Sequence, residues 1–196
     1  MGNLTVNRFK GKQILDYIEQ LAALRIKIFR EYPYLYEGDY EYEMKYLSTY
    51  ATSEEAILVV AKDDDNIIGL STAIPLQFET PEAQQPFNDL NLPIEPFFYL
   101  GESVLLPEYR GSGIYRQYFQ EREAAAIAFG CKKATFCGVV RDANDPRRPH
   151  DYIPLDNIWR HFGYERHPKL CAYYEWQEIG ASEQTKKPMA FWIKSL

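Results

Sequence analysis

The sequence predicts one domain, residues 1–196, of the mixed α/β (α+β) class: a mostly antiparallel sheet with a central parallel pair, flanked by helices. Two observations predict this class. The expected elements run strand, helix, helix, two strands, long loop, strand, helix, strand, helix and two strands. The strand–helix–strand segment around residues 97–140 requires a parallel pair joined by a right-handed crossover. The remaining strands follow one another as hairpins and should pair antiparallel.

The composition is that of a globular protein with a sizeable core. A chain of 196 residues buries roughly 70% of the surface that its unfolded form exposes, so it needs no disulfide or metal to fold. Hydrophobic residues make up 46% of the chain and charged residues 26%, which excludes disorder as the main state. No apolar run approaches the ~18–20 residues of a membrane span, and the N-terminal residues lack an apolar signal core.

Charge and cysteine usage narrow the partners and the compartment. The 22 basic and 28 acidic residues give a net charge of −6, which disfavours a nucleic-acid partner. The three cysteines cannot all pair and form no CxxC, so a reducing, cytoplasmic compartment is expected. The three histidines, His150, His161 and His167, lack metal-ligand spacing, and we expect no metal.

The first quarter of the chain predicts a strand and two helices. Residues 4–9 alternate as a short strand, and residues 14–29 place apolar side chains at helical spacing. Pro33 ends that region because proline breaks a helix. Residues 40–50 predict a second helix with apolar side chains on its inner face.

The next segments predict a hairpin and a long loop. Residues 56–61 are an apolar run of strand length, and residues 67–76 are its partner across the turn 63–66. Residues 80–96 contain four prolines among polar residues, which predicts a long loop that could include one helical turn.

The most apolar strand and the clearest helix follow. Residues 97–106 predict a buried strand that Pro107 ends, and residues 113–129 predict a helix with one apolar stripe. Gly130 is a natural residue for the end of that helix. Three charged residues of the helix should face water: Glu121, Arg122 and Glu123.

The last third completes the sheet. Residues 133–140 predict a strand, residues 141–154 a charged loop with prolines, and residues 155–162 a short helix. Residues 171–177 and 189–193 are the final two strands. These exposed last strands permit a homodimer without requiring one.

The segment between the apolar strand and its helix contains the strongest functional pattern. It reads Arg110-Gly111-Ser112-Gly113 and runs straight into the helix. Glycines allow tight backbone turns, and the first amides of a helix have no internal partner. These amides and the helix dipole suit a phosphate, and Arg110 can add positive charge. On spacing alone, a plain helix start with two turn glycines is the favoured explanation of the segment.

At these residues the sequence resembles the acyl-CoA-binding segment of the GCN5-related N-acetyltransferases (GNAT family), whose pattern is [QR]-x-x-G-x-[GA]. Arg110 matches the first position and Gly113 the fourth, whereas Tyr115 stands where glycine or alanine is usual. Residues 159–164 resemble the family's late F-Y-x-K-x-G-F segment, and residues 189–193 suit its final strand. The resemblance covers almost the whole chain and implies the GNAT fold.

The resemblance implies acetyl-CoA (coenzyme A) as the cofactor, bound in a V-shaped gap between the strand ending at Leu106 and the strand ending near Val140. Pantetheine would pair with main-chain groups of Val104, Leu105 and Leu106. The pyrophosphate would lie on the amides of the following residues: Arg110, Gly111, Ser112, Gly113, Ile114 and Tyr115. The Ser112 hydroxyl could add a further contact.

Acetyl transfer to an amine needs a base, a donor for the thioester oxyanion and help for the leaving thiolate. Glu102 is the first choice for the base because it interrupts the apolar strand just before the phosphate loop. The alternative is that Glu102 faces the other side and pairs with a lysine or arginine. A backbone amide near Val104 or Leu105 could hold the oxyanion.

The general acid is less clear. The family uses the tyrosine of its late segment, and that position here is Trp159, whose indole cannot protonate a thiolate. Tyr152, Tyr164 or His161 could substitute, or the thiolate could leave without an acid; we take Tyr152 as the candidate. Cys137 on a central strand is a weak alternative nucleophile for a two-step reaction.

Four residues are candidates for the acceptor side. In the family, the segment between the first two helices lines this side, and here it carries Tyr32, Tyr34 and Tyr36. Their rings could cradle an amine by cation–π contact, although plain packing explains any one of them as well. Arg25 interrupts an apolar helix face and could hold an acceptor carboxylate, which would favour an amino-acid-like acceptor.

We therefore predict an acetyl-CoA-dependent N-acetyltransferase that moves an acetyl group to a primary amine of a small molecule by direct transfer. Neither nucleic acid nor membrane is expected as a partner. Two alternatives stay open at this point. One is a non-catalytic acyl-CoA-binding module with a GNAT fold, favoured by the departures at Tyr115 and Trp159. The other is a protein-lysine or N-terminal acetyltransferase, which would need an exposed groove.

Overall fold

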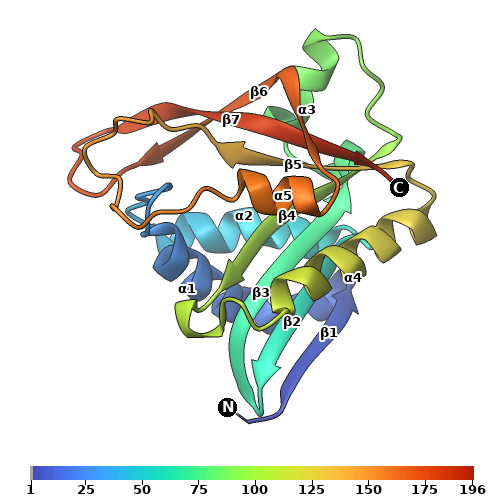
Figure 1. Ribbon diagram of the computed structural model, residues 1–196. Coiled ribbons are helices and arrows are strands. Elements are labelled where there is room, and N and C mark those ends of the chain that lie inside the picture. The colour runs from blue at the N-terminus through green and yellow to red at the C-terminus, as the bar shows by residue number, and fades with distance from the viewer. Residues whose placement is uncertain (1) are drawn as a thin grey trace.

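The computed structural model describes residues 2–196 and contains one seven-stranded sheet in the order β1-β2-β3-β4-β5-β7-β6 (Figure 1). The strands are β1 Leu4–Lys10, β2 Ile57–Asp63, β3 Asn66–Pro75, β4 Phe97–Leu105, β5 Lys133–Val139, β6 Glu165–Gln177 and β7 Gln184–Ser195. The α-helices are α1 Ile18–Phe29, α2 Tyr40–Thr52, α3 Pro81–Asp89, α4 Ile114–Phe129 and α5 Asp156–His161. Three short 3-10 helices are η1 Gly11–Tyr17, η2 Leu76–Phe78 and η3 Pro107–Tyr109.

The sheet confirms the predicted mixture of strand directions. β4 and β5 are parallel, with Phe97–Tyr99 opposite Lys133–Thr135, and α4 makes the crossover between them. All the other neighbouring strands are antiparallel. The fold class and its central parallel pair are as the sequence predicts.

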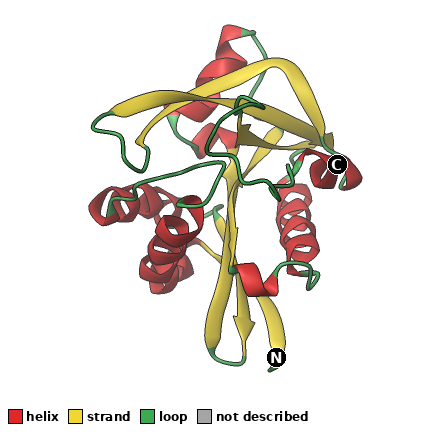
Figure 2. Cartoon of the chain, turned by 60° about the vertical axis from the view of Figure 1, so that its left-hand side comes forward, coloured by secondary structure: helices red, strands yellow, loops and turns green. Residues whose placement is uncertain are grey.

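Helices cover both faces of the sheet, which Figure 2 shows with α1 and α2 on one side and α4 on the other. This two-sided cover explains why the sequence of β2 is apolar at successive positions and does not alternate with polar residues. Leu58 and Val60 pack into the core under α1 and α2, whereas Ile57 and Val59 pack under α4. A strand that is buried on both faces reads as a continuous hydrophobic run.

The segment predicted as a long loop contains a helix, so that prediction is wrong for residues 81–89. Pro81 occupies the first turn of α3, where a proline costs nothing because its missing amide would be unpaired anyway. Ala83 and Phe87 are fully buried, and the Phe87 ring packs edge-on against Phe191 with ring centres 5.1 Å apart. The polar residues between them hide this apolar stripe in the sequence.

Other boundaries also differ from the prediction. The first helical region begins as η1 and becomes α-helical only at Ile18, and both last strands extend beyond the predicted ranges. Arg122 does not face water as expected, because it is 2% exposed. Its guanidinium lies 5.1 Å over the Phe119 ring, and its Nε donates to the Tyr118 carbonyl. No helix within residues 2–196 has the length and apolar character needed to cross a membrane.

One irregularity of the sheet opens a gap between two strands. Ser71 pairs with Ser103 and Ala73 with Leu100, so Gly101 and Glu102 both lie opposite one residue of β3. Such a bulge bends its strand and increases the local twist. Beyond Tyr99, no strand of the described chain pairs with the edge of β4 that faces β5. β4 and β5 therefore diverge into the wedge that the sequence led us to expect.

Candidate active site

The predicted phosphate loop lies at the end of the wedge, between η3 and α4. Gly113 has φ = 89° and nothing lies within 4 Å of where its Cβ would be, so this position is open as well as left-handed. Within residues 2–196, no hydrogen bond uses the amides of Gly111, Gly113 or Ile114. Free amides at a helix start fit an anion, and the unpaired edge of β4 fits an extended chain beside it.

The side chains of the loop are arranged around these amides. The Ser112 hydroxyl donates to the Tyr109 carbonyl at 2.6 Å and braces the turn. Arg110 Nη2 donates to Glu31 Oε2 at 2.9 Å, and both side chains are exposed. An exposed pair of this kind is worth about 1 kcal/mol or less, so Arg110 can exchange its carboxylate for a phosphate at little cost.

Tyr115 is accommodated because its ring turns into the space between α4 and α5. The ring packs edge-on against Phe119 at 5.2 Å and contacts Phe162. Its hydroxyl accepts a hydrogen bond of 3.0 Å from Trp159 Nε1. Tyr115 and Trp159, the two residues that depart from the family pattern, are thus hydrogen-bonded to each other. Trp159 also packs over Gly138, where a Cβ would lie 2.7 Å from the indole.

Glu102, the predicted base, points from the bulge toward α1. Arg25 Nη1 donates to its Oε2 at 2.6 Å, and Thr72 Oγ1 donates to its Oε1 at 2.9 Å. Arg25 Nε donates to Glu43 Oε2 at 2.5 Å. Glu102 therefore pairs with an arginine, which is another predicted site residue, and this contact fixes its carboxylate without deciding whether it acts as the base.

Arg25 is held on all sides by its own chain. Its guanidinium lies 5.0 Å over the Phe29 ring and 4.9 Å over the Tyr46 ring. Although burial opposes its charge, Glu102 and Glu43 hold the pKa of Arg25 well above the ordinary value. A guanidinium committed to two internal carboxylates does not suit the expected role of holding an acceptor carboxylate, and we no longer assign it that role.

Sequence reasoning missed a set of groups beside Glu102, which we call the acid–phenol cluster: Glu79, Tyr46, Tyr50, Tyr99 and Tyr174. The Tyr46 hydroxyl lies 3.3 Å from that of Tyr50 and donates to Glu79 Oε1 at 3.5 Å. Burial first, and then neighbours that include Glu79, raise the pKa of Tyr99 and Tyr174. The spacing of Tyr42, Tyr46 and Tyr50 along α2 was a signal for a tyrosine face.

The acid–phenol cluster connects to the bulge through Gly101. A Cβ on this glycine would lie 2.4 Å from Thr72 Oγ1 and 2.7 Å from the Tyr50 hydroxyl. Both oxygens therefore converge on the space that glycine leaves free. Because Thr72 also donates to Glu102, a continuous row of polar groups runs from Glu102 to Glu79.

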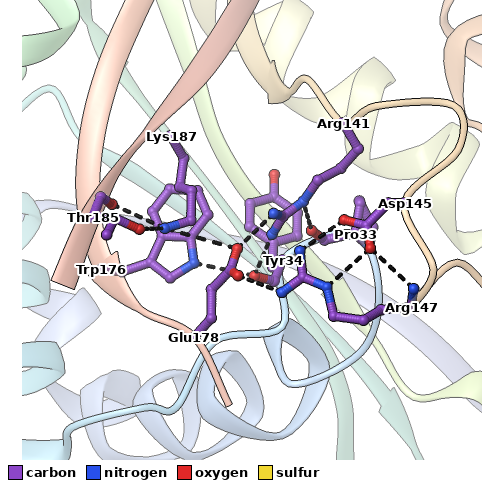
Figure 3. A network of polar contacts seen from close by, with 9 residues as sticks. All are labelled: Pro33, Tyr34, Arg141, Asp145, Arg147, Trp176, Glu178, Thr185 and Lys187. Carbon is purple, nitrogen blue, oxygen red and sulfur yellow. Dashed lines mark hydrogen bonds and ion pairs between the residues drawn. The ribbon is translucent and has the colours of Figure 1, made fainter. Parts of the chain in front are cut away.

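The loop with the three predicted tyrosines is fastened by the network in Figure 3. Arg141 Nε donates to the Pro33 carbonyl at 2.5 Å, and its Nη2 donates to the Tyr34 carbonyl at 2.9 Å. Trp176 Nε1 donates to the same Tyr34 carbonyl at 3.1 Å. Residues 141–154 and the β6–β7 hairpin therefore hold this loop together.

Glu178 is the hub of that network (Figure 3). It forms ion pairs with Arg141 and Arg147, each at 2.5 Å, and with Lys187 at 3.7 Å. Although burial opposes its charge, the hydrogen bonds from Arg147 and Arg141 hold the pKa of Glu178 below its usual range. Arg147 also binds Asp145, which fixes the fold of its own loop.

The three tyrosines have different neighbours. Tyr34 packs against Phe29 at 4.5 Å, and Tyr36 forms an isolated bridge with Glu178. Tyr32 meets Tyr152 edge-on at 4.7 Å, so the structure brings the candidate acid next to one of the candidate acceptor residues. Burial and the neighbouring Tyr32 raise the pKa of the Tyr152 phenol.

Two further sequence hypotheses concern nucleophiles and metals. Burial raises the pKa of the Cys137 thiol to about 12, and the Tyr99 hydroxyl lies 3.1 Å from its sulfur. A thiol that stays protonated is a poor nucleophile, which disfavours the two-step alternative. Among residues 2–196, no group of three or more His, Cys, Asp or Glu side chains is placed to hold a metal ion.

Solved structures share this fold at low sequence identity. A ribosomal-protein-alanine N-acetyltransferase from Brucella melitensis matches with a TM-score of 0.60 and 15% identity, over 97% of this chain and 99% of that chain. A proposed acetyltransferase from Salmonella typhimurium, solved with its cofactor acetyl-CoA, matches with a TM-score of 0.56 and 10% identity, over 100% of this chain and 95% of that chain.

An IAA acetyltransferase from Bacillus cereus matches with a TM-score of 0.55 and 11% identity, over 99% of this chain and 100% of that chain. No curated protein matches the sequence. Residues 11–149, more than half of the chain, match the sequence profile of the acetyltransferase (GNAT) family. The chain therefore belongs to the acetyltransferase (GNAT) family, which uses acetyl-CoA as the acetyl donor.

Proposed function

We propose that the protein transfers an acetyl group to a primary amine of a small molecule by direct transfer. The observation that supports this most is the position of Glu102 at the bulge. Its carboxylate faces α1 and α2, whereas the phosphate loop leads into α4 on the other face of the sheet. An amine that enters from the α1–α2 side can thus meet a coenzyme held from the α4 side.

The chain offers a binding group for each part of the coenzyme. When bound, acetyl-CoA supplies the acetyl group as a thioester and leaves as the free thiol. The free edge of β4 at Val104, Leu105 and Leu106 suits the pantetheine arm. The free amides of Gly111, Gly113 and Ile114 suit the pyrophosphate, with Arg110 and the Ser112 hydroxyl beside them, whereas the amides of Arg110 and Ser112 already bond to Pro107 and Tyr109 carbonyls.

Within this proposal, Glu102 accepts the proton that the acceptor amine loses. Arg25 and Thr72 fix the orientation of its carboxylate. Tyr152 is the proposed proton donor for the leaving thiolate; a phenol is protonated at neutral pH, and burial raises the pKa of Tyr152 further. Tyr32, Tyr34 and Tyr36 line the path of the acceptor. A domain over residues 1–196, a cytoplasmic location and a possible homodimer stay predictions.

Glu102→Gln is expected to lower kcat at pH 7 by about 10²–10⁴-fold, because the amide keeps the shape of the side chain but cannot take a proton. Steady-state release of CoA thiol with a panel of small amines measures the effect. Glu43→Gln is the matched control, since it removes the other carboxylate from Arg25. If both variants lose activity equally, Glu102 acts only through its charge and is not the base.

Gly113→Val is expected to abolish coenzyme binding, because a valine resists φ = 89° and brings a side chain to the free amides. Acetyl-CoA at ~100 times its dissociation constant should stabilise the native protein by about 2.7 kcal/mol, seen as a rise in Tm, and ATP should not. Gly130→Val is the matched control, because Gly130 has φ = 97° at the opposite end of α4.

If acetyl-CoA raises the Tm of Gly113→Val as much as that of the native protein, the loop at residues 110–113 is not the coenzyme site. A normal shift combined with no thiol release from any amine would favour the non-catalytic module. Acetylation of proteins in a lysate, without turnover of the amine panel, would favour a protein acetyltransferase.

A further inference from the structure

Glu79 is a buried carboxyl group that the proposed mechanism does not use. It follows η2 directly, is 6% exposed and accepts a hydrogen bond from Tyr46 on Oε1, and bonds from Tyr50 and the Thr80 amide also act on its carboxyl group. No atom of residues 2–196 forms a hydrogen bond with its Oε2. Buried polar atoms are nearly always paired, and leaving one unpaired costs free energy. This oxygen therefore fits a donor that comes from outside the chain.

The walls around Glu79 suit a cation. The phenols of Tyr46 and Tyr50 bond to the Glu79 carboxyl group, and the charge of Glu79 reaches Tyr99 and Tyr174. Aromatic faces attract ammonium groups. The ring of Tyr46 already holds one cation, since the Arg25 guanidinium lies 4.9 Å over it. That guanidinium is committed to Glu43 and Glu102, so it leaves Glu79 without a positive partner. Tyr46 and Tyr174 are only partly buried, unlike Tyr50.

Glu79 and the proposed base lie at the two ends of one polar row. Starting from Glu102, the row passes through Thr72, Tyr50 and Tyr46 and ends at Glu79. A short acceptor that places one amine at the bulge therefore has a second acidic end within reach along the same row. A plain monoamine would leave the Glu79 end without a donor.

We propose that Glu79 and the phenols of Tyr46 and Tyr50 form a subsite for a protonated amine, so that the preferred acceptor is a short aliphatic diamine. One nitrogen is acetylated beside Glu102, and the other stays an ammonium ion bound to Glu79. This inference rests on the proposed function for its substrate, but it concerns a separate subsite. It assigns the acceptor class that the family leaves open.

The titration of Glu79 supports this assignment. Burial, and then the charge of Glu102, raises the pKa of Glu79 to about 7. A bound ammonium stabilises the carboxylate, so the affinity for a diamine should rise as the pH increases through 7. The titratable and charged groups that act on Glu79 or on its phenols are these: Arg25 of α1, Tyr46 and Tyr50 of α2, Glu82 of α3, Tyr99 and Glu102 of β4, Cys137 of β5 and Tyr174 of β6.

The test is calorimetric titration of 1,4-diaminobutane and of butylamine into the CoA-loaded protein at pH 8. We expect the native protein to bind the diamine about tenfold or more tightly than the monoamine. Glu79→Gln should weaken the diamine more than butylamine and so abolish that preference. Glu82→Gln, which removes an exposed carboxylate three positions away, should keep the preference.

Equal affinities of the native protein for the two amines would overturn the subsite. A Glu79→Gln variant that weakens both amines equally would overturn it too, since Glu79 would then serve the structure of the site. A diamine preference that depends on Glu79 supports the subsite even if no thiol is released, in which case only the proposed transfer fails. Turnover of butylamine without any preference for the diamine would support the proposed acetyl transfer and contradict the Glu79 subsite.

Discussion

Replacing Arg25 with methionine is expected to lower the free energy of unfolding by about 3–5 kcal/mol, the range for breaking a buried ion pair from one side. Arg25 separates Glu43 and Glu102, which are both buried, and no second cation is in contact with either carboxylate within residues 2–196. Methionine fills the space between the Phe29 and Tyr46 rings but leaves two carboxylates uncompensated. Denaturant unfolding at pH 7 measures the loss.

Two comparisons separate charge from packing in this variant. Arg30→Met removes an exposed pair with Glu37 and should cost about 1 kcal/mol or less. Glu43→Gln and Glu102→Gln remove the uncompensated charges, so the Arg25→Met penalty should shrink when it is measured in that double variant. A penalty of the same size in both backgrounds would mean that Arg25 stabilises the fold by packing alone.

Glu79→Gln is expected to change how stability depends on pH. The pKa of Glu79 is about 7 in the folded protein, against 4.5 for a glutamate outside the folded structure. Between these two pH values the folded protein therefore keeps a proton that the unfolded chain has lost. Stability linked to this proton is complete below pH 4.5 and is lost as the pH rises to just above 7. The difference, 7 − 4.5 = 2.5 pKa units, corresponds to about 3 kcal/mol.

Glutamine carries no such proton and should be free of this loss. The stability of Glu79→Gln relative to the native protein should therefore rise by about 3 kcal/mol between pH 4.5 and pH 8. Urea unfolding of both proteins at both pH values measures this difference. A constant difference between native protein and Glu79→Gln would show that Glu79 titrates like an exposed carboxyl group.

The coenzyme side of the molecule is predictable from sequence because its signals are local. A glycine pair between an apolar strand and an amphipathic helix specifies a turn with free amides, whatever the rest of the chain does. The parallel pair follows from the strand–helix–strand order alone. The structure adds what the spacing could not show: Tyr115 turns into the α4–α5 space and bonds to Trp159.

The acceptor side is less predictable because its contacts are long-range. Arg25 bonds to Glu43 at 18 positions away and to Glu102 at 77 positions away, so no window of sequence contains the cluster. Charged residues are rarely buried, which makes solvent exposure the default expectation for Glu43, Glu79 and Arg122. The only local signal for the acid–phenol cluster was the spacing of the tyrosines along α2. Polar residues surround these tyrosines in the sequence, so the pattern does not stand out as a buried face.

The loop around Tyr34 and the strand β4 should differ in their resistance to local unfolding. Side chains of the Glu178 network fasten this loop from distant segments, with Arg141 and Trp176 reaching carbonyls 108 and 142 positions away. The loop around Tyr34 lies outside the sheet and its carbonyls bond to side chains, whereas β4 is a central strand, and segments of the first kind open locally more readily than core strands. Hydrogen exchange should therefore be faster in the backbone around Tyr34 than in β4, so that the proposed acceptor side can rearrange while β4 stays rigid.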